Sequence, residues 1–189
     1  MMRMTETVKQ LLIINIIFYV GSNIVGANAY HLFSMYFPTN PNFRFWQPLT
    51  SMFMHAPIYD NGNPGSLMHI LFNMFAMVSF GSALEHYWGA KKFIFFYISC
   101  GLGAALLHIG FNFYEYHQAV GVLVDAKIPQ DAIDTLLKSG QYNETLTNAV
   151  PLSTLEQVYF SFNGTSLGAS GAIYGLLTAC AFIFPMAEL

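Results

Sequence analysis

Residues 168–175 read GASGAIYG and place the hydroxyl of Ser170 between glycines, where a long apolar run begins. At the N-terminus of a helix the first backbone N–H groups lack intrahelical partners, so they can hold a developing anion. A hydroxyl beside such donors is half of a serine hydrolase site, in which the serine is the nucleophile and the donors stabilise an oxyanion. The segment itself supplies no general base.

A second polar pair lies in the apolar stretch LMHILFNMF, where His69 and Asn73 are four residues apart. This spacing places both side chains on one face of a helix. Imidazole and carboxamide groups are hydrogen-bond donors that would complete an oxyanion hole at Ser170. Each feature alone also has a structural interpretation, because membrane serines often bond their own i−4 carbonyl and His/Asn pairs often join helices.

The helix that follows Ser170 has two distinct faces. Ser170 and Tyr174 share one face, whereas Gly168, Gly171 and Gly175 make a second, bare face. The Gly171-x-x-x-Gly175 pattern lets another helix backbone approach closely. We therefore expect this helix to pack by its glycines, which have a structural role, and to present Ser170 to a cavity.

The elements that carry these residues are predicted from composition. The chain has 189 residues, of which 54% are hydrophobic and 9% are charged, whereas about 25% of residues are charged in a typical soluble domain. Mean hydropathy is +0.45. These values predict an integral membrane protein in contact with the lipid bilayer. The net charge of −3 and the lack of a basic patch argue against a nucleic-acid partner.

A membrane-spanning helix needs about 20 mostly apolar residues. Four stretches qualify as transmembrane helices, at about 11–29, 67–84, 93–111 and 169–185. Two polar connections separate them, an outer loop at 38–66 and an outer insert at 112–165, in which we expect one or two short amphipathic helices at the membrane surface. The predicted fold is a single all-α domain over residues 1–189, a polytopic membrane helix bundle.

Basic residues predict the orientation of the bundle. The segments before the first and between the second and third predicted helices carry Arg3, Lys9, Lys91 and Lys92. Basic segments stay in the cytoplasm, so the N-terminus is expected inside and both long connections outside. Ser170 then lies at the outer end of the fourth helix, and a bacterial host would hold the protein in its inner membrane.

These segments together resemble the rhomboid intramembrane serine proteases. GASGAIYG resembles the family's G-x-S-G motif, and LMHILFNMF resembles its H-x-x-x-N motif. FWQPLTSMFMHA is similar to the W-R-x-x-T…H segment of its first outer loop, and GSALEHYWGAKKF resembles the end of its second helix. The ordered match runs from about Trp46 to Tyr174. Gln47 takes the place of an arginine that is common in the family motif.

The resemblance implies a role for each matched residue. Ser170 would be the nucleophile, and Gly168, the Ser170 backbone, His69 and Asn73 would form the oxyanion hole. Tyr174 would stack against the catalytic histidine and fix its ring. Structural roles are implied for Trp46, His55 and Glu85. Substrates would be other transmembrane proteins, cut in or near their membrane segments.

The family's general base is a histidine on the sixth helix, in an A-H-x-x-G setting that is absent from these 189 residues. We expect this chain to hold the first four of six helices, as a truncated or split polypeptide that is inactive by itself. His31, His86 and His117 fit the role of base poorly. His108, near the outer end of the third helix, is interpreted as structural.

Two functions stay open at this point. The first is an intramembrane serine endopeptidase that works through an acyl-enzyme at Ser170; the second is a non-catalytic rhomboid-like scaffold or chaperone that binds transmembrane helices. A channel or transporter has little support, because no chain of intramembrane charges marks an ion path. No metal site is predicted since the histidines do not cluster, and no cofactor is signalled. Cys100 and Cys180 are expected as free buried thiols.

Overall fold

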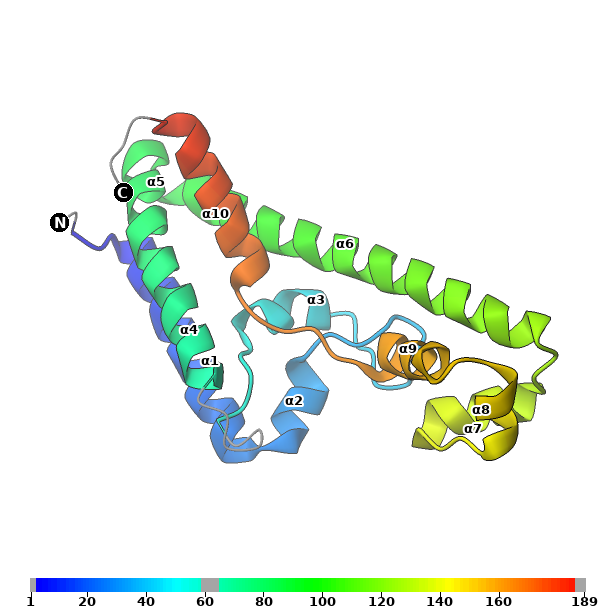
Figure 1. The fold of residues 1–189 in the computed structure, drawn as a ribbon. Coiled ribbons are helices and arrows are strands. Elements are labelled where there is room, and N and C mark those ends of the chain that lie inside the picture. The colour runs from blue at the N-terminus through cyan, green and yellow to red at the C-terminus, as the bar shows by residue number, and fades with distance from the viewer. Residues whose placement is uncertain (1–2, 59–64, 186–189) are drawn as a thin grey trace. The chain divides into compact units, whose positions relative to one another are not determined.

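The computed structural model describes residues 3–58 and 65–185 (Figure 1). The regular elements in these residues are helices, in agreement with the predicted all-α fold, and one isolated β-bridge joins Met35 and Ser166. Residues 59–64 of the predicted outer loop lie outside the described residues. The chain divides into two compact units, the first made of the described parts of 1–35, 45–106 and 166–189 and the second of 36–44 and 107–165. The single domain predicted over 1–189 stays a prediction.

The first unit holds most of the apolar helices. Its elements are α1 (Glu6–Val25), α2 (Ala27–Phe33), α3 (Gln47–Thr50), the 3-10 turn η1 (Ser51–Phe53), α4 (Gly65–Ala76), the π-helical turn η2 (Met77–Gly81), α5 (Ser82–Trp88), the first part of α6 (Ala90–Asp125) and α10 (Ser170–Ile183). In Figure 1, α4 and α5 form one nearly continuous rod beside α1 and α10. The π-helical turn contacts both α1 and α10.

Within residues 3–58 and 65–185, three helices are long and apolar enough to cross a membrane: Glu6–Val25, Leu67–Trp88 and Ala90–Asp125. They correspond to the first three predicted spans. The fourth predicted span is shorter than expected, because α10 has 14 residues. At 1.5 Å per residue it is about 21 Å long, less than the roughly 30 Å of a bilayer's hydrocarbon core.

The first span begins and ends earlier than the predicted range of 11–29. It ends at Val25 because Gly26 adopts a φ of +73°, which interrupts the helix before α2. It begins at Glu6 because Glu85 accepts hydrogen bonds from the backbone N–H groups of Thr7 and Val8. These bonds satisfy donors that a helix start otherwise leaves unpaired.

The second unit is built on the last part of α6. Three helices follow it: α7 (Gln130–Ser139), α8 (Glu144–Ala149) and α9 (Leu152–Asn163). Their apolar faces share one core with α6, formed by Ala119, Leu123, Ile133, Leu136, Leu146, Val150, Leu155 and Val158. The amphipathic helix expected in the insert is therefore α7, and its apolar residues are buried within the unit.

Candidate active site

Ser170 is the first residue of α10, and Ala169 precedes it as the N-cap. The Ser170 side chain is half-buried, and its hydroxyl forms no hydrogen bond with another residue in the described part of the chain. The amides of the first turn of a helix have no intrahelical acceptor, and the helix dipole adds partial positive charge there. Ser170 thus lies beside backbone donors that can stabilise negative charge.

The segment before α10 is held by two backbone contacts. Met35 and Ser166 exchange N–H to carbonyl bonds of 2.9 Å, and the Gly168 N–H donates to the Ser51 carbonyl at 2.8 Å. The φ of Gly168 is +121°, a value that residues with a side chain rarely adopt. Because the Gly168 N–H is already paired, the backbone donors left for an anion are those of the first turn of α10.

The bare side of Gly168 faces both His69 and Ser170. A Cβ placed on Gly168 would lie 3.4 Å from His69 Cε1 and 3.7 Å from Ser170 Oγ. The imidazole from α4 and the hydroxyl from α10 therefore flank the same small space. These are ordinary van der Waals distances, so the backbone at Gly168 brings the His69 ring and the Ser170 hydroxyl close to one another.

Asn73 follows His69 by one turn of α4. It is buried, with 7% of its surface exposed, and its side-chain Nδ2 has no hydrogen-bond partner among the described residues. An unsatisfied buried donor costs free energy of about 1–3 kcal/mol. Such a donor, on the same helical face as His69, is a group that a bound carbonyl oxygen or oxyanion would satisfy.

The His55 ring packs against the His69 ring. It is fully buried, its ring centroid is 5.8 Å from that of His69, and its Nδ1 lies 3.3 Å from the Phe53 carbonyl. Burial, with a smaller contribution from the neighbouring His69, lowers the pKa of His55 to about 4. His55 is therefore neutral at neutral pH and packs against the His69 ring without adding a charge to the site.

Tyr174 lies one turn after Ser170 on α10, and 70% of its side chain is exposed. The backbone carbonyl of Tyr174 accepts a hydrogen bond from the Thr178 hydroxyl at 2.8 Å. Its ring is thus available to stack against a further group, the role that the resemblance implies.

The loop from α2 to η1 is fixed by side chains that cap α2. Trp46 Nε1 donates to the Leu32 carbonyl at 3.0 Å, and Thr50 Oγ1 donates to the Phe33 carbonyl at 2.9 Å. Gln47, which replaces the family's arginine, is buried and donates to the His31 carbonyl at 3.3 Å. The last carbonyls of a helix lack intrahelical partners, so these three bonds hold the end of α2 beside α3.

Glu85 ties the second span to the start of the first. Its carboxylate accepts from the Thr5 hydroxyl at 2.5 Å and from the backbone N–H groups of Thr7 and Val8 at 3.2 and 3.0 Å. A carboxylate at a helix N-terminus satisfies free donors and complements the helix dipole. Glu85 is 7% exposed and lies far from the serine in the sequence.

The two glycines of α10 lie against α6. A Cβ on Gly171 would be 2.5 Å from Ala104 Cβ, and one on Gly175 would be 2.7 Å from Cys100 Cβ. Both distances are shorter than real carbon contacts, so the helices approach this closely only because the glycines have no side chain. These two contacts limit how closely α6 and α10 approach, and α10 also packs on η2, α4 and α5.

Two contacts at the site were not predicted from the sequence, although His55 was among the residues given a structural role. The Ser51 carbonyl, which holds Gly168, is a backbone group that any residue type supplies, so no sequence signal marks it. The packing of His55 on His69 joins residues on either side of the outer loop. Among the described residues, no group of three or more histidine, cysteine, aspartate or glutamate side chains is placed to hold a metal ion.

Part of this chain is similar to proteins of one known family. Residues 42–123 match the family model of the rhomboid domain. The matched range includes Trp46, His55, His69 and Glu85 and ends before Ser170. A relative named Rhomboid-like protein 15, from Arabidopsis thaliana, is 39% identical over 59 residues, which are 28% of this chain and 15% of the relative. The matched part thus spans a small fraction of that protein.

The family match covers α4, which carries His69 and Asn73, but not α10, which begins at Ser170. The matched range holds most of the outer loop with α3 and η1, all of α4 to α5 and all but the last two residues of α6. Taken together, the rhomboid domain over residues 42–123 and the similarity to the plant protein support membership of this chain in the rhomboid family.

Proposed function

We propose that this chain provides the nucleophile and the oxyanion hole of an intramembrane serine endopeptidase. The observation that carries the proposal is the proximity of the His69 ring to the Ser170 hydroxyl, both of which lie within 4 Å of one point beside Gly168. A scissile carbonyl bound beside Ser170 would meet a nucleophile and a donor at once. The three apolar spans support a location in a membrane, where the substrates would be transmembrane proteins.

The proposed reaction begins with attack of Ser170 Oγ on the scissile carbonyl carbon. A C–O bond forms while the carbonyl π electrons move to oxygen, and the resulting oxyanion accepts hydrogen bonds from His69, Asn73 and the first amides of α10. The tetrahedral intermediate expels the amine and leaves an acyl-enzyme, which water hydrolyses. The serine proton passes to a general base and then to the leaving amine.

The general base is the part of this mechanism that the proposal takes from the family. By resemblance, it is a histidine of an A-H-x-x-G segment, which would stack on Tyr174. His69 is assigned to the oxyanion and not to proton transfer, because it shares a helix face with the unpartnered Asn73 donor. The orientation proposed for the protein, with Ser170 opening to the outer side, rests on the distribution of basic residues.

Labelling with a fluorophosphonate probe tests the assignment of the nucleophile. The protein expressed from the full reading frame that encodes this chain is expected to form a covalent adduct, and Ser170→Ala is expected to abolish labelling. Asn73→Ala should retain the nucleophile but slow cleavage of a transmembrane substrate by about 10²–10³-fold, as loss of one oxyanion donor does elsewhere. Equal labelling of the wild type and Ser170→Ala would refute the proposal.

One observation favours a second candidate, a non-catalytic scaffold that binds transmembrane helices. The Ser170 hydroxyl has no hydrogen-bond partner among the described residues, whereas an activated serine is paired with a base. This candidate predicts that the full-frame protein neither labels nor cleaves, yet retains helical partners when isolated from membranes. Ser170→Ala would then leave partner recovery unchanged.

A further inference from the structure

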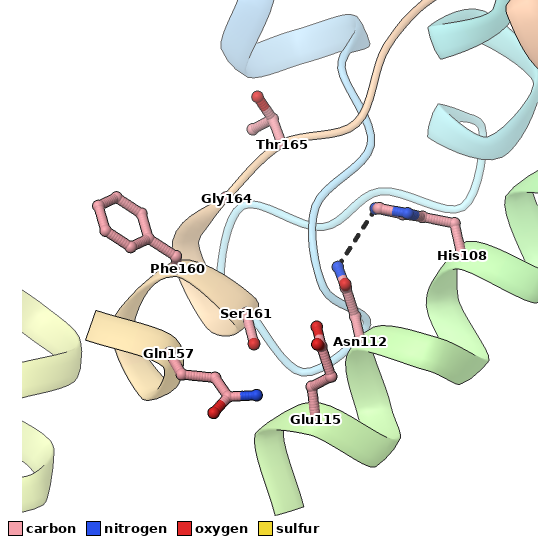
Figure 2. A pocket seen from close by; sticks show the side chains of 8 residues that line it. All are labelled: His108, Asn112, Glu115, Gln157, Phe160, Ser161, Gly164 and Thr165. Atoms are coloured by element: carbon pink, nitrogen blue, oxygen red, sulfur yellow. Dashed lines mark hydrogen bonds between the residues drawn. The ribbon is translucent and has the colours of Figure 1, made fainter. Parts of the chain in front are cut away.

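The second unit contains a polar cleft that the proposed protease mechanism does not use (Figure 2). Its volume is about 280 Å³, and it lies between α6 and α9. The cleft is lined by His108, Asn112, Glu115, Gln157, Phe160, Ser161, Gly164 and Thr165. All of these residues belong to the second unit, so the cleft is a feature of that unit alone.

Helical spacing explains why the polar groups converge. His108, Asn112 and Glu115 are separated by four and three residues on α6, and this spacing places them on one face. Gln157 and Ser161 are one turn apart on α9 and line the opposite wall. Figure 2 shows the Ser161 hydroxyl and the Glu115 carboxylate directed toward the same part of the cleft, whereas the Phe160 ring points away.

The two walls are held at a fixed separation by packing within the unit. The Phe37 ring lies 6.2 Å from Phe113 on α6 and 5.8 Å from Phe162 on α9, measured between centroids. The buried Asn40 side chain donates to the Phe162 carbonyl at 2.9 Å. Tyr116 and Phe162 also pack directly, at 5.7 Å. The cleft is therefore preorganised and does not need to form on binding.

Several polar groups of the cleft can accept hydrogen bonds and have few partners. The Asn112 amide nitrogen and His108 Nε2 satisfy each other at 3.2 Å. In contrast, no described residue forms an ion pair or hydrogen bond with Glu115. Ser161 is 7% exposed, and its hydroxyl has no hydrogen-bond partner among the described residues. A carboxylate without a hydrogen-bond partner thus faces the unpartnered hydroxyl of a largely buried serine.

We infer that this cleft binds the ammonium or guanidinium group of a lysine or arginine side chain from a polypeptide partner. A carboxylate, a hydroxyl and carboxamide oxygens are complementary to a cation with several N–H donors, and hydrogen bonds to charged groups are the stronger ones. The cleft has the size of one long side chain and opens outward, so a side chain of a bound polypeptide can enter it. The inference is independent of catalysis at Ser170.

The lining residues favour a polypeptide cation over an amino lipid. An amine-bearing phospholipid carries a phosphate next to its ammonium group, and the cleft contains no lysine or arginine to neutralise it. The phosphate would instead meet the field of Glu115, a like charge. A lysine or arginine side chain brings no such anion, and its methylene stem can lie along the wall of the cleft.

Saturation-transfer NMR on the full chain in maltoside micelles tests this inference. The probe is the peptide acetyl-Ala-Lys-Ala-amide, compared with the same peptide carrying norleucine in place of lysine. Saturation of the lysine ε-methylene is expected for the wild type, and little saturation is expected for norleucine. Glu115→Gln should weaken the apparent affinity about tenfold, which corresponds to about 1.4 kcal/mol.

Matched variants make the result specific. Glu156→Gln removes the same charge from the neighbouring, exposed position on α9 that does not line the cleft, so it should bind like the wild type. Ser161→Ala gives a second, smaller loss and keeps the test informative if Glu115→Gln folds poorly. Equal weakening by Glu115→Gln and Glu156→Gln, or equal saturation of the lysine and norleucine peptides, would overturn the inference.

An experiment in bicelles distinguishes a lysine side chain from a lipid headgroup as the bound amine. In bicelles, replacement of phosphatidylcholine by phosphatidylethanolamine should leave lysine-peptide binding unchanged. If phosphatidylethanolamine displaces the peptide from the wild type but not from Glu115→Gln, a lipid headgroup occupies the cleft, and the polypeptide assignment is overturned.

Discussion

The contact between α10 and α6 gives a prediction whose size follows from one distance. A methyl group on Gly171 would lie 2.5 Å from the Cβ of Ala104, whereas non-bonded carbon atoms rest about 3.5–4.0 Å apart. The Ala104 Cβ is attached directly to the backbone and cannot rotate away. Gly171→Ala therefore requires the two helices to separate by about 1 Å.

The cost of this separation exceeds the gain in helix propensity. Overpacking of a well-packed contact costs about 1–3 kcal/mol, and replacement of glycine by alanine within a helix returns about 1 kcal/mol. Because the 2.5 Å contact cannot be relieved by side-chain rotation, the cost belongs to the upper half of that range, about 2–3 kcal/mol, and we expect a net destabilisation of about 1–2 kcal/mol for Gly171→Ala. For a chain of this size, each kcal/mol lowers Tm by about 2–4 °C, so the expected decrease is about 2–8 °C.

The assay is thermal unfolding of the chain in micelles, with Gly103→Ala as the matched control. Gly103 is also a helical glycine, on α6, but a Cβ there would meet no atom within 4 Å. Gly103→Ala should keep only the propensity gain, and its Tm should equal or exceed that of the wild type. A Gly171→Ala protein that melts at or above the wild-type Tm would show that the glycine face does not set the helix separation.

Two further predictions follow from buried groups. Because the pKa of His55 is lowered from 6.5 to about 4, the unfolded state binds more protons between these values, so the free energy of unfolding should fall by about 3 kcal/mol as pH decreases from 6.5 to 4. His55→Gln should remove this pH dependence in denaturant titrations, and an unchanged slope would contradict the assignment. Glu85→Ala removes the acceptor of the Thr7 and Val8 amides, so it should destabilise the start of α1 by about 0.5–2 kcal/mol. Faster hydrogen exchange confined to the first turn of α1 is the expected signature, and exchange equal to that of the wild type would refute the capping role.

The membrane helices were predictable because their signal is local. A span must cover its backbone with about 20 apolar residues, and this requirement is written along the chain. The three spans of the structure overlap the predicted stretches accordingly. Their ends were less predictable, since α1 begins where Glu85 caps it and Glu85 lies 77 residues from Val8 in the sequence.

The second unit depended on contacts that periodicity does not reveal. Residues 112–125 were predicted to lie in the outer insert, yet α6 continues through them to Asp125. Their apolar positions, Ala119 and Leu123, are buried by α7 to α9. A helix of this composition is stabilised by its partners and not by its own propensity, so the sequence of the segment alone did not indicate its length.

The sequence by itself determined the helical spans, the types of residue that could do chemistry and the spacing that places His69 and Asn73 on one helical face, because each of these properties is set by neighbours within a few residues. Only the tertiary structure decided that His69 and Ser170 meet beside Gly168, that the Ser51 carbonyl accepts the Gly168 N–H, and that the His55 ring packs against His69. These features join segments that are distant along the chain, and their geometry follows from how closely whole helices can pack.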